Sequence, residues 1–209
     1  MSLTVKKRRF LQDGYLELKL SDGRKLKLDP VGWNLNELEE GCELSNECFA
    51  ALDNQSELLE CRYKAESLLL NRLHTTYELR QKLFKKGDYR KEFIFQVLDE
   101  LETSGFLNDE NFATLYATEL IGRGYGKRAI SQRFYKKGLR GESIKLILDE
   151  ICSENSEVES ALLRLAEKKL KSLSREKDEY KKRQKLFRYL AGRGFDSSEI
   201  NKVLQQVLK

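Results

Sequence analysis

Residues 78–101, ELRQKLFKKGDYRKEFIFQVLDEL, carry the pattern of two helices separated by a tight stop. Leu79 and Leu83 lie eight and four residues before Gly87, so they share one face of the first helix. Two lysines fill its last turn, where cations suit the helix dipole, and we expect Gly87 to take the left-handed position that ends the helix. Apolar residues then recur at the spacing of a buried helix face: Ile94, Val97, Leu98 and Leu101.

The same pattern occurs twice more, around Gly138 and Gly194, and the three glycines are 51 and 56 residues apart. Apolar residues stand eight and four positions before each of the two later glycines: Ile130 and Phe134, then Leu186 and Leu190. Apolar residues also follow each of them at matching offsets: Ile144, Ile147, Leu148 and Ile151, then Ile200, Val203, Leu204 and Val207. A further apolar helix precedes each copy, and the first copy has one extra residue after its glycine. The chain is therefore predicted to contain three tandem three-helix units.

The N-terminal part of the chain lies outside this repeat. Apolar residues alternate over residues 4–28, and Asp13-Gly14 and Asp22-Gly23 separate the alternating runs. Asp-Gly pairs suit hairpin turns, because both central positions need positive φ. We therefore expect a three-stranded antiparallel meander. The basic run at residues 6–9 lies on its first strand, where lysines guard an exposed edge against aggregation or, alternatively, contact nucleic acid.

A short helical turn over residues 36–40 and a longer helix are expected after the meander. Ser45 resembles a helix N-cap, so the helix is predicted to begin at Asn46. We expect it to stop near residues 53–54, where an Asp-Asn pair favours a break, and to resume from Ser56.

Composition and charge narrow the choice of partner. Charged residues make up 35% of the 209 residues and there is a single proline, a combination that suits long, solvated helices. Residues 1–60 hold 8 basic and 12 acidic side chains, a net charge of −4, whereas the rest of the chain holds 31 and 22, a net charge of +9. A basic helical body favours a polyanion or an acidic protein surface as partner, although ordinary solvated helices would show the same balance.

Compartment and cofactors follow from what the sequence contains. No apolar run approaches the roughly 20 residues that span a bilayer, and the N-terminal basic cluster has no apolar segment after it. The four cysteines lack the paired spacing of a metal site or a disulfide framework, so we expect reduced thiols, a cytoplasmic protein, and no metal or cofactor.

A glycine-rich segment, Gly122-Arg123-Gly124-Tyr125-Gly126-Lys127-Arg128, joins two predicted helices of the second unit. It matches neither a Walker loop nor a dinucleotide fingerprint, because no strand precedes it. Its backbone amides, with Arg123, Lys127 and Arg128, suit a phosphate. A simple helix–helix turn is the equally weighted alternative.

No catalytic constellation is evident. His74 is the only histidine, and without a partner in the sequence it is expected on a loop surface. Asp99-Glu100 and Asp149-Glu150 are adjacent pairs that diverge on a helix, so they do not form an acid–base pair. We therefore expect a protein that is not an enzyme.

A series of short motifs occurs, in order, at residues 75–80 (TTYELR), 83–87 (LFKKG), 97–101 (VLDEL), 105–109 (GFLND), 112–113 (FA), 124–126 (GYG) and 137–138 (KG). This series resembles the RecX family of recombination regulators, and the resemblance covers residues 62–209. The resemblance implies a mainly α fold with three tandem, helix-turn-helix-like repeats in an elongated, curved array. With the small N-terminal β-meander and helix, the expected domains are residues 1–60, 61–107, 108–152 and 153–209.

The same resemblance implies a partner. It implies binding along the helical groove of the RecA filament, with reduced strand exchange, ATP hydrolysis and co-protease activity, and hence a role in DNA repair and the SOS response. Single-stranded DNA or a nucleoprotein is the second expected partner, with weak direct binding to DNA. The residues at the basic positions of the first two repeats are the expected contacts: Arg72, Arg80, Lys85, Lys86, Arg123, Lys127, Arg128, Lys136 and Lys137. A monomer is expected, because the repeats can bury their apolar faces on one another.

Two further functions stay open at this point. Three-helix units with a tight turn also resemble sequence-specific helix-turn-helix proteins. The helices that would read DNA, however, carry acidic residues near their starts and few of the side chains that recognise base edges. A helical scaffold for some other protein is the third possibility.

Overall fold

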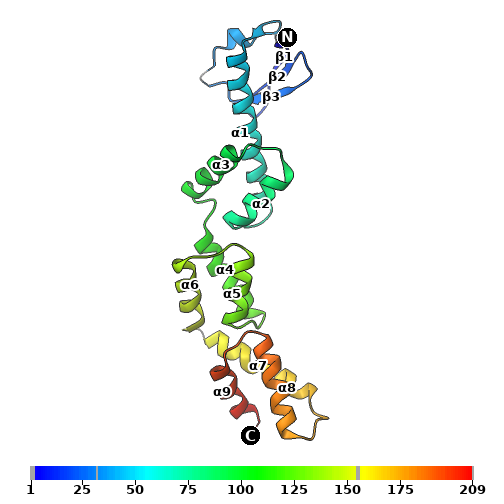
Figure 1. Ribbon diagram of the computed structural model, residues 1–209, viewed down its shortest axis with the longest axis vertical. Coiled ribbons are helices and arrows are strands. Elements are labelled where there is room, and N and C mark those ends of the chain that lie inside the picture. The colour runs from blue at the N-terminus through cyan, green and yellow to red at the C-terminus, as the bar shows by residue number, and fades with distance from the viewer. Residues whose placement is uncertain (1–2, 32, 154–155, 209) are drawn as a thin grey trace. The chain divides into compact units, whose positions relative to one another are not determined.

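The computed structural model describes residues 3–31, 33–153 and 156–208. These residues form four β-strands, one short 3₁₀ helix and nine α-helices (Figure 1). The chain divides into two compact units. The first contains the residues up to Leu73 together with Leu79–Leu107, and the second contains His74–Glu78 together with the residues from Asn108 onward. Among the described residues, no helix has both the length and the apolar character needed to cross a bilayer.

The first unit begins with a four-stranded antiparallel sheet. Its strands are β1 (Leu3–Phe10), β2 (Leu16–Leu20), β3 (Lys25–Leu28) and β4 (Glu43–Leu44), in the spatial order β3-β2-β1-β4. The predicted three-stranded meander is confirmed by β1 to β3, and β4 joins it as a fourth strand that was not predicted. After the 3₁₀ helix η1 (Leu35–Leu38), a turn at Gly41 brings β4 back to pair with the start of β1. Such a pairing between distant residues leaves no local signal.

Helix α1 (Asn46–Asn71) is continuous over 26 residues, so the interruption predicted at residues 53–54 was wrong. Ser45 caps it as expected, because its Oγ accepts a hydrogen bond from the Cys48 amide at 3.1 Å. Packing against the sheet overrides the weak local preference: Leu52 is fully buried, and the Ser56 Oγ accepts a hydrogen bond from the Lys27 amide. The predicted division between residues 60 and 61 lies inside this helix, and the four-domain division remains a prediction.

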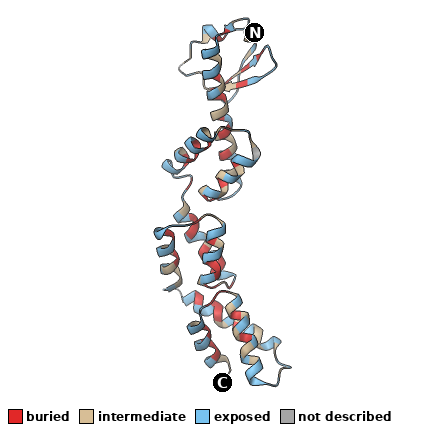
Figure 2. Ribbon diagram, viewed as in Figure 1, coloured by how far each residue is buried: buried red, intermediate tan, exposed pale blue. Residues whose placement is uncertain are grey.

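The C-terminal half of α1 packs with α2 (Thr76–Lys86) and α3 (Lys91–Thr103). The apolar positions predicted around Gly87 are all buried, as Figure 2 shows along the facing sides of these helices. Gly87 itself does not have a positive φ, so its predicted left-handed conformation was wrong. The extra residue in this copy lengthens the turn, and the glycine instead makes room for the ring of Tyr89.

Six helices of the second unit share one hydrophobic core: α4 (Asp109–Gly122), α5 (Lys127–Lys136), α6 (Glu142–Ser153), α7 (Ser156–Ser172), α8 (Glu179–Gly192) and α9 (Ser197–Val207). The turns at Gly138 and Gly194 have φ of 77° and 89°, as predicted. Leu139 and Phe195, the residues that follow these glycines, are buried and close each turn. The repeated apolar pattern therefore specifies two three-helix layers within one core.

The segment His74–Glu78 belongs to this second unit. The Thr75 hydroxyl donates a hydrogen bond to the Lys137 carbonyl at 2.7 Å, and the Thr76 amide donates to an Asp109 carboxylate oxygen at 2.8 Å. His74 is only 3% exposed, so its expected position on a loop surface was wrong. It is buried because its neighbours in sequence anchor the segment to the turn after α5.

Candidate partner-binding groove

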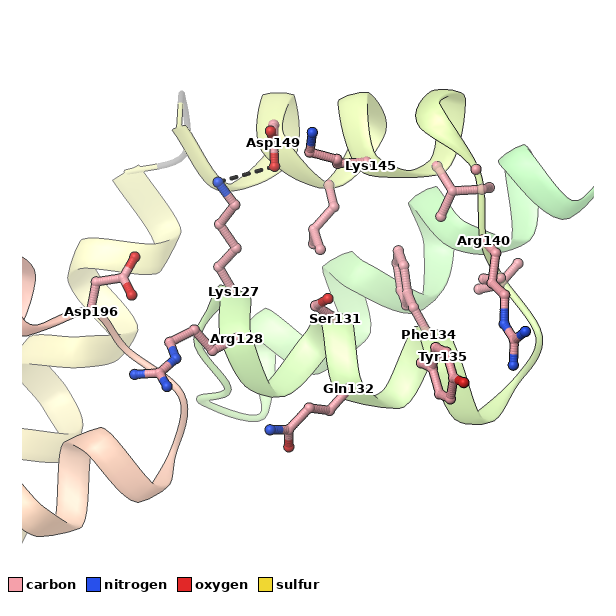
Figure 3. Close-up of a pocket in the computed structure, with 14 residues that line it drawn as sticks. Lys127, Arg128, Ser131, Gln132, Phe134, Tyr135, Arg140, Lys145, Asp149 and Asp196 are labelled. Atoms are coloured by element: carbon pink, nitrogen blue, oxygen red, sulfur yellow. Dashed lines mark ion pairs between the residues drawn. The ribbon is translucent and has the colours of Figure 1, made fainter.

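An open groove of about 620 Å³ lies between α5 and α6 and extends to the start of α9 (Figure 3). Its floor consists of side chains that are almost fully buried: Phe134, Leu139, Ile144 and Leu148. Its walls are polar, and they carry four cations and two carboxylates: Lys127, Arg128, Arg140, Lys145, Asp149 and Asp196. The groove thus offers a rigid apolar base with charged groups at its margin.

The turn after α5 gives the groove its shape. The Gly138 amide donates to the Tyr135 carbonyl at 3.1 Å, and the Leu139 amide donates to the Phe134 carbonyl at 3.0 Å. These two bonds form the glycine-terminated helix end in which a hydrophobic residue folds back onto the helix. Because Leu139 is held in this way, the chain reverses within a few residues and α6 returns alongside α5, which leaves the groove between them.

The charges along the groove are unequally neutralised. Lys127 pairs with Asp149 at 3.0 Å, and this hydrogen bond raises the pKa of the Lys127 ammonium. Lys145 lies 3.4 Å from Glu142. Within the described part of the chain, neither Arg128 nor Arg140 forms an ion pair. The two arginines are therefore the groove cations with guanidinium groups open to a partner.

Arg140 is also combined with an aromatic side chain. Its guanidinium carbon lies 4.1 Å from the ring centroid of Tyr135, and Tyr135 is 62% exposed. In Figure 3 this pair lies at one end of the groove, and Arg128 with Asp196 lies at the other. Arginine and tyrosine are the side chains that most often anchor protein interfaces, so the groove has the composition of a protein-binding surface.

The first-repeat cations expected as contacts do not line this groove. Arg72 follows the end of α1, is exposed, and donates from Nη1 to the Leu73 carbonyl at 2.7 Å. On α2, Arg80 is half-buried and Lys85 is exposed. The side chain of Lys86 lies outside the described part of the structure. Arg80 and Lys85 belong to the first unit and are not among the residues that line the groove.

The second-repeat cations fall into three environments. Lys127 and Arg128 line the groove. Lys136 is exposed at the end of α5, and Arg123 pairs with Glu119 at 2.6 Å. Lys137 is half-buried, because its ammonium pairs with Glu78 at 2.6 Å and lies 5.5 and 5.3 Å from two aromatic rings, Phe112 and Tyr116. Lys137 therefore holds the segment 74–78 in place and is not a cation on open surface.

The glycine-rich segment between α4 and α5 uses the amides of residues 123–126 and 128 within the fold. The amides of Gly124 and Tyr125 donate to carbonyls that end α4, and those of Gly126 and Arg128 donate to the carbonyls of Arg193 and Gly194 at 2.9 and 3.1 Å. A Cβ on Gly126 would overlap the backbone of Gly194, and a Cβ on Gly194 would overlap Ala129 in the first turn of α5. The segment is a packed joint between two turns, so of the two alternatives left open by the sequence it fits the helix–helix turn.

The expected contacts did not include Tyr135, Arg140 and Lys145, which line the groove. Tyr135 and Arg140 flank the turn glycine, and an exposed aromatic next to an arginine in a helix–helix turn is the signal that would have indicated them. Among the described residues, no cluster of three or more His, Cys, Asp or Glu side chains is placed to bind a metal ion. Burial raises the pKa of the Cys152 thiol, near Lys127, to about 11, so this cysteine is not a reactive thiolate.

A family model and the curated relatives that match this chain all carry the same description, RecX. Residues 157–204 match the family model described as the third three-helix domain of RecX. The chain is 30% identical to the regulatory protein RecX of Caldanaerobacter subterraneus subsp. tengcongensis, over 80% of each sequence. It is 35% identical to that of Vibrio cholerae, over 71% of this chain and 94% of the relative.

Solved structures share the fold. The crystal structure of a regulatory protein RecX has a TM-score of 0.76 at 20% identity, covering 97% of this chain and 99% of that one. The structure of RecX from Lactobacillus salivarius has a TM-score of 0.66 at 22% identity, covering 72% of this chain and 96% of that one. The mainly helical fold with a small N-terminal sheet is therefore shared with RecX structures.

Proposed function

This chain belongs to the RecX family, and from that membership we propose that it regulates a RecA recombinase. The relatives are named regulatory proteins, which fits a chain without a catalytic constellation in its sequence. In the proposed mechanism the helical repeats bind along the groove of the RecA–DNA filament and reduce strand exchange, ATP hydrolysis and co-protease activity. The protein thereby moderates DNA repair and the SOS response, as a monomer in the cytoplasm.

The groove between α5 and α6 is the surface we propose for the recombinase. Arg128 and the Arg140–Tyr135 pair are its anchors, because their guanidinium groups form no ion pair within the described chain. Each guanidinium offers several donors in a fixed plane, which matches a carboxylate on the partner. Of the nine cations expected from the sequence, Lys127 and Arg128 are the two that lie in this groove.

Reading of a DNA sequence by the third helix of each repeat is the competing function. Acidic residues occupy the first turns of α3, α6 and α9: Glu92, Glu142 and Glu199. A recognition helix contacts base edges with its N-terminal residues, and negative charge there repels the phosphates on either side. This observation favours the regulator.

Single-stranded-DNA-dependent ATP hydrolysis by the cognate RecA tests the proposal. We expect the protein to inhibit hydrolysis at concentrations well below that of RecA, because it acts on a cooperative filament. Absence of inhibition, with retained binding to a duplex of defined sequence, would instead establish the sequence-reading function.

The double variant Arg128→Glu and Arg140→Glu tests the groove. Losing one interface anchor weakens binding by about 2 kcal/mol, which is about thirty-fold in affinity. Because the variant changes both arginines, the protein concentration needed for half-maximal inhibition should rise at least about thirty-fold. The double variant Lys168→Glu and Lys171→Glu is the matched control, since both lysines are exposed on α7 and lie outside the groove. Equal inhibition by the two variants would remove the groove from the binding surface.

A further inference from the structure

The charges of the first 60 residues are strongly segregated. All eight basic side chains lie within residues 6–27, whereas residues 29–60 contain nine acidic side chains and no basic one. The basic part coincides with strands β1 to β3, and the acidic part covers the loop and the first half of α1. The net charge of −4 for residues 1–60 is therefore the sum of a basic sheet and an acidic loop and helix.

Strand register gathers three lysines into one row. Lys7 on β1 is directly opposite Lys19 on β2, and Lys19 is directly opposite Lys25 on β3. Residues directly opposite in neighbouring strands share a face of the sheet, and the buried leucines of β2 alternate with Lys19, so the row lies on the face away from the core. All three lysines are exposed. Like charges placed directly opposite one another are destabilising, so the row is unfavourable without an anion.

One carboxylate lies within this face. Glu17 is in the next row and lies 3.4 Å from Arg9 and 3.9 Å from Lys25, so it is shared between two cations. Lys7, Arg9, Glu17, Lys19 and Lys25 together line a shallow hollow of about 250 Å³. Four cations and one carboxylate leave a charge of +3. Within the described residues Lys7 and Lys19 form no ion pair.

Protection of a sheet edge explains only part of this arrangement. Edge lysines prevent strands from pairing with other chains, which applies to Lys25 on the edge strand β3, but Lys19 is on β2, which lies between β1 and β3 and has no free edge. Structural pairing does not explain it either. Lys27, on the same strand as Lys25, shows what a structural lysine does here: its ammonium pairs with Asp13 at 2.7 Å and lies over the rings of Tyr15 and Tyr63.

We propose that this face, Lys7–Arg9–Lys19–Lys25, binds the phosphate backbone of a nucleic acid without reading its sequence. Neighbouring strands are about 4.8 Å apart, so the three lysines span about 10 Å and suit a linear polyanion with regularly spaced charges. Protein interfaces are depleted in lysine and centred on apolar or aromatic side chains. All five residues that line this hollow are charged. Lysine contacts to phosphate are the usual basis of sequence-independent binding. The proposal stands whether or not the chain regulates RecA.

Fluorescence anisotropy of a labelled oligothymidine, titrated with the full chain in the absence of recombinase, tests this site. The triple variant Lys7→Ala, Lys19→Ala and Lys25→Ala should bind more weakly. The slope of log affinity against log salt should fall by about 2, because three phosphate contacts are lost. Glu17→Gln should shift affinity the opposite way, since it removes the one carboxylate of the face. The triple variant Lys168→Ala, Lys171→Ala and Lys177→Ala changes net charge equally at exposed sites elsewhere and should leave affinity and slope near wild type.

Three results would overturn the proposal. An unchanged salt slope in the Lys7, Lys19 and Lys25 variant is the first, and an equal loss in the control variant is the second. The third is that the same lysine variant binds polyglutamate more weakly than the wild type but binds oligothymidine equally well, which would assign the face to an acidic protein. If the triple variant loses its fold, the single variants Lys19→Ala and Glu17→Gln decide, because each changes one charge and they must move affinity in opposite directions.

Discussion

Replacing Gly138 with alanine should destabilise the protein more than the same replacement at Gly105. The two glycines have nearly equal φ, 77° and 78°. An L-residue in this left-handed region costs about 1–2 kcal/mol. At Gly105 a new methyl group meets no atom within 4 Å, so this is the whole cost. At Gly138 the methyl overlaps Cβ and Cγ of Tyr77 and lies 2.9 Å from its Cδ1. Such overpacking adds about 1–3 kcal/mol, for a total of about 2–5 kcal/mol.

Thermal unfolding followed by circular dichroism measures the difference. For a chain of this size, 1 kcal/mol shifts Tm by about 2–4 °C, so the Gly138 variant should melt clearly below the Gly105 variant. Gly141→Ala is the control within the second unit, since its φ is 105° and its surroundings are open. Tyr77→Gly removes both overlapping atoms, so combining it with Gly138→Ala should cost less than the sum of the two single changes.

Equal melting of the Gly138 and Gly141 variants, together with additive effects of the Tyr77 and Gly138 changes, would refute this reasoning. It would mean that the start of α2 does not rest on the turn after α5. The hydrogen bond from Thr75 to the Lys137 carbonyl and the Glu78–Lys137 ion pair, which are part of the same contact, would then be in doubt as well.

Two other perturbations test separate features of the structure. Asn54→Pro should lower the free energy of unfolding by about 3 kcal/mol or more, because it interrupts the continuous helix α1, whereas Asn54→Ala should be nearly neutral. Equal denaturant midpoints for the two variants would show that the helix is interrupted at residues 53–54 after all. Burial raises the pKa of Cys61 and of Cys152 from 9.0 to about 11, so the unfolded chain loses these thiol protons first and stability should fall as pH rises from about 9 to about 11. The double variant Cys61→Ala and Cys152→Ala should lose that part of the pH dependence in denaturant unfolding; an identical pH profile would show that the thiols are solvated.

The expected contacts illustrate how far sequence reasoning reaches at a binding surface. Lys136 and Lys137 are neighbours of the same type at the end of one helix, yet only Lys136 is exposed. The difference arises from Glu78, which is 59 residues away in sequence. Arg140 was not among the expected contacts, although its packing on Tyr135 makes it a groove residue. Whether a cation is open to a partner depends on where distant carboxylates lie, and helical spacing does not report that.

The sequence alone determined the helical body of this protein. Most residues that recur with the 3.6 period around Gly138 and Gly194 are buried, and Ile147, Ile151 and Val207 are partly buried against the same core, because a helix places such residues on one face whatever it packs against. The turns at Gly138 and Gly194 were also predictable from the sequence, since the positive φ that each requires selects glycine. Two features, by contrast, were decided only by the tertiary structure. Packing against the sheet keeps α1 continuous, and strand register places Lys7, Lys19 and Lys25 in one row. Both depend on which distant segments meet, and the free energy of such contacts overrides the weaker local preferences that a sequence displays.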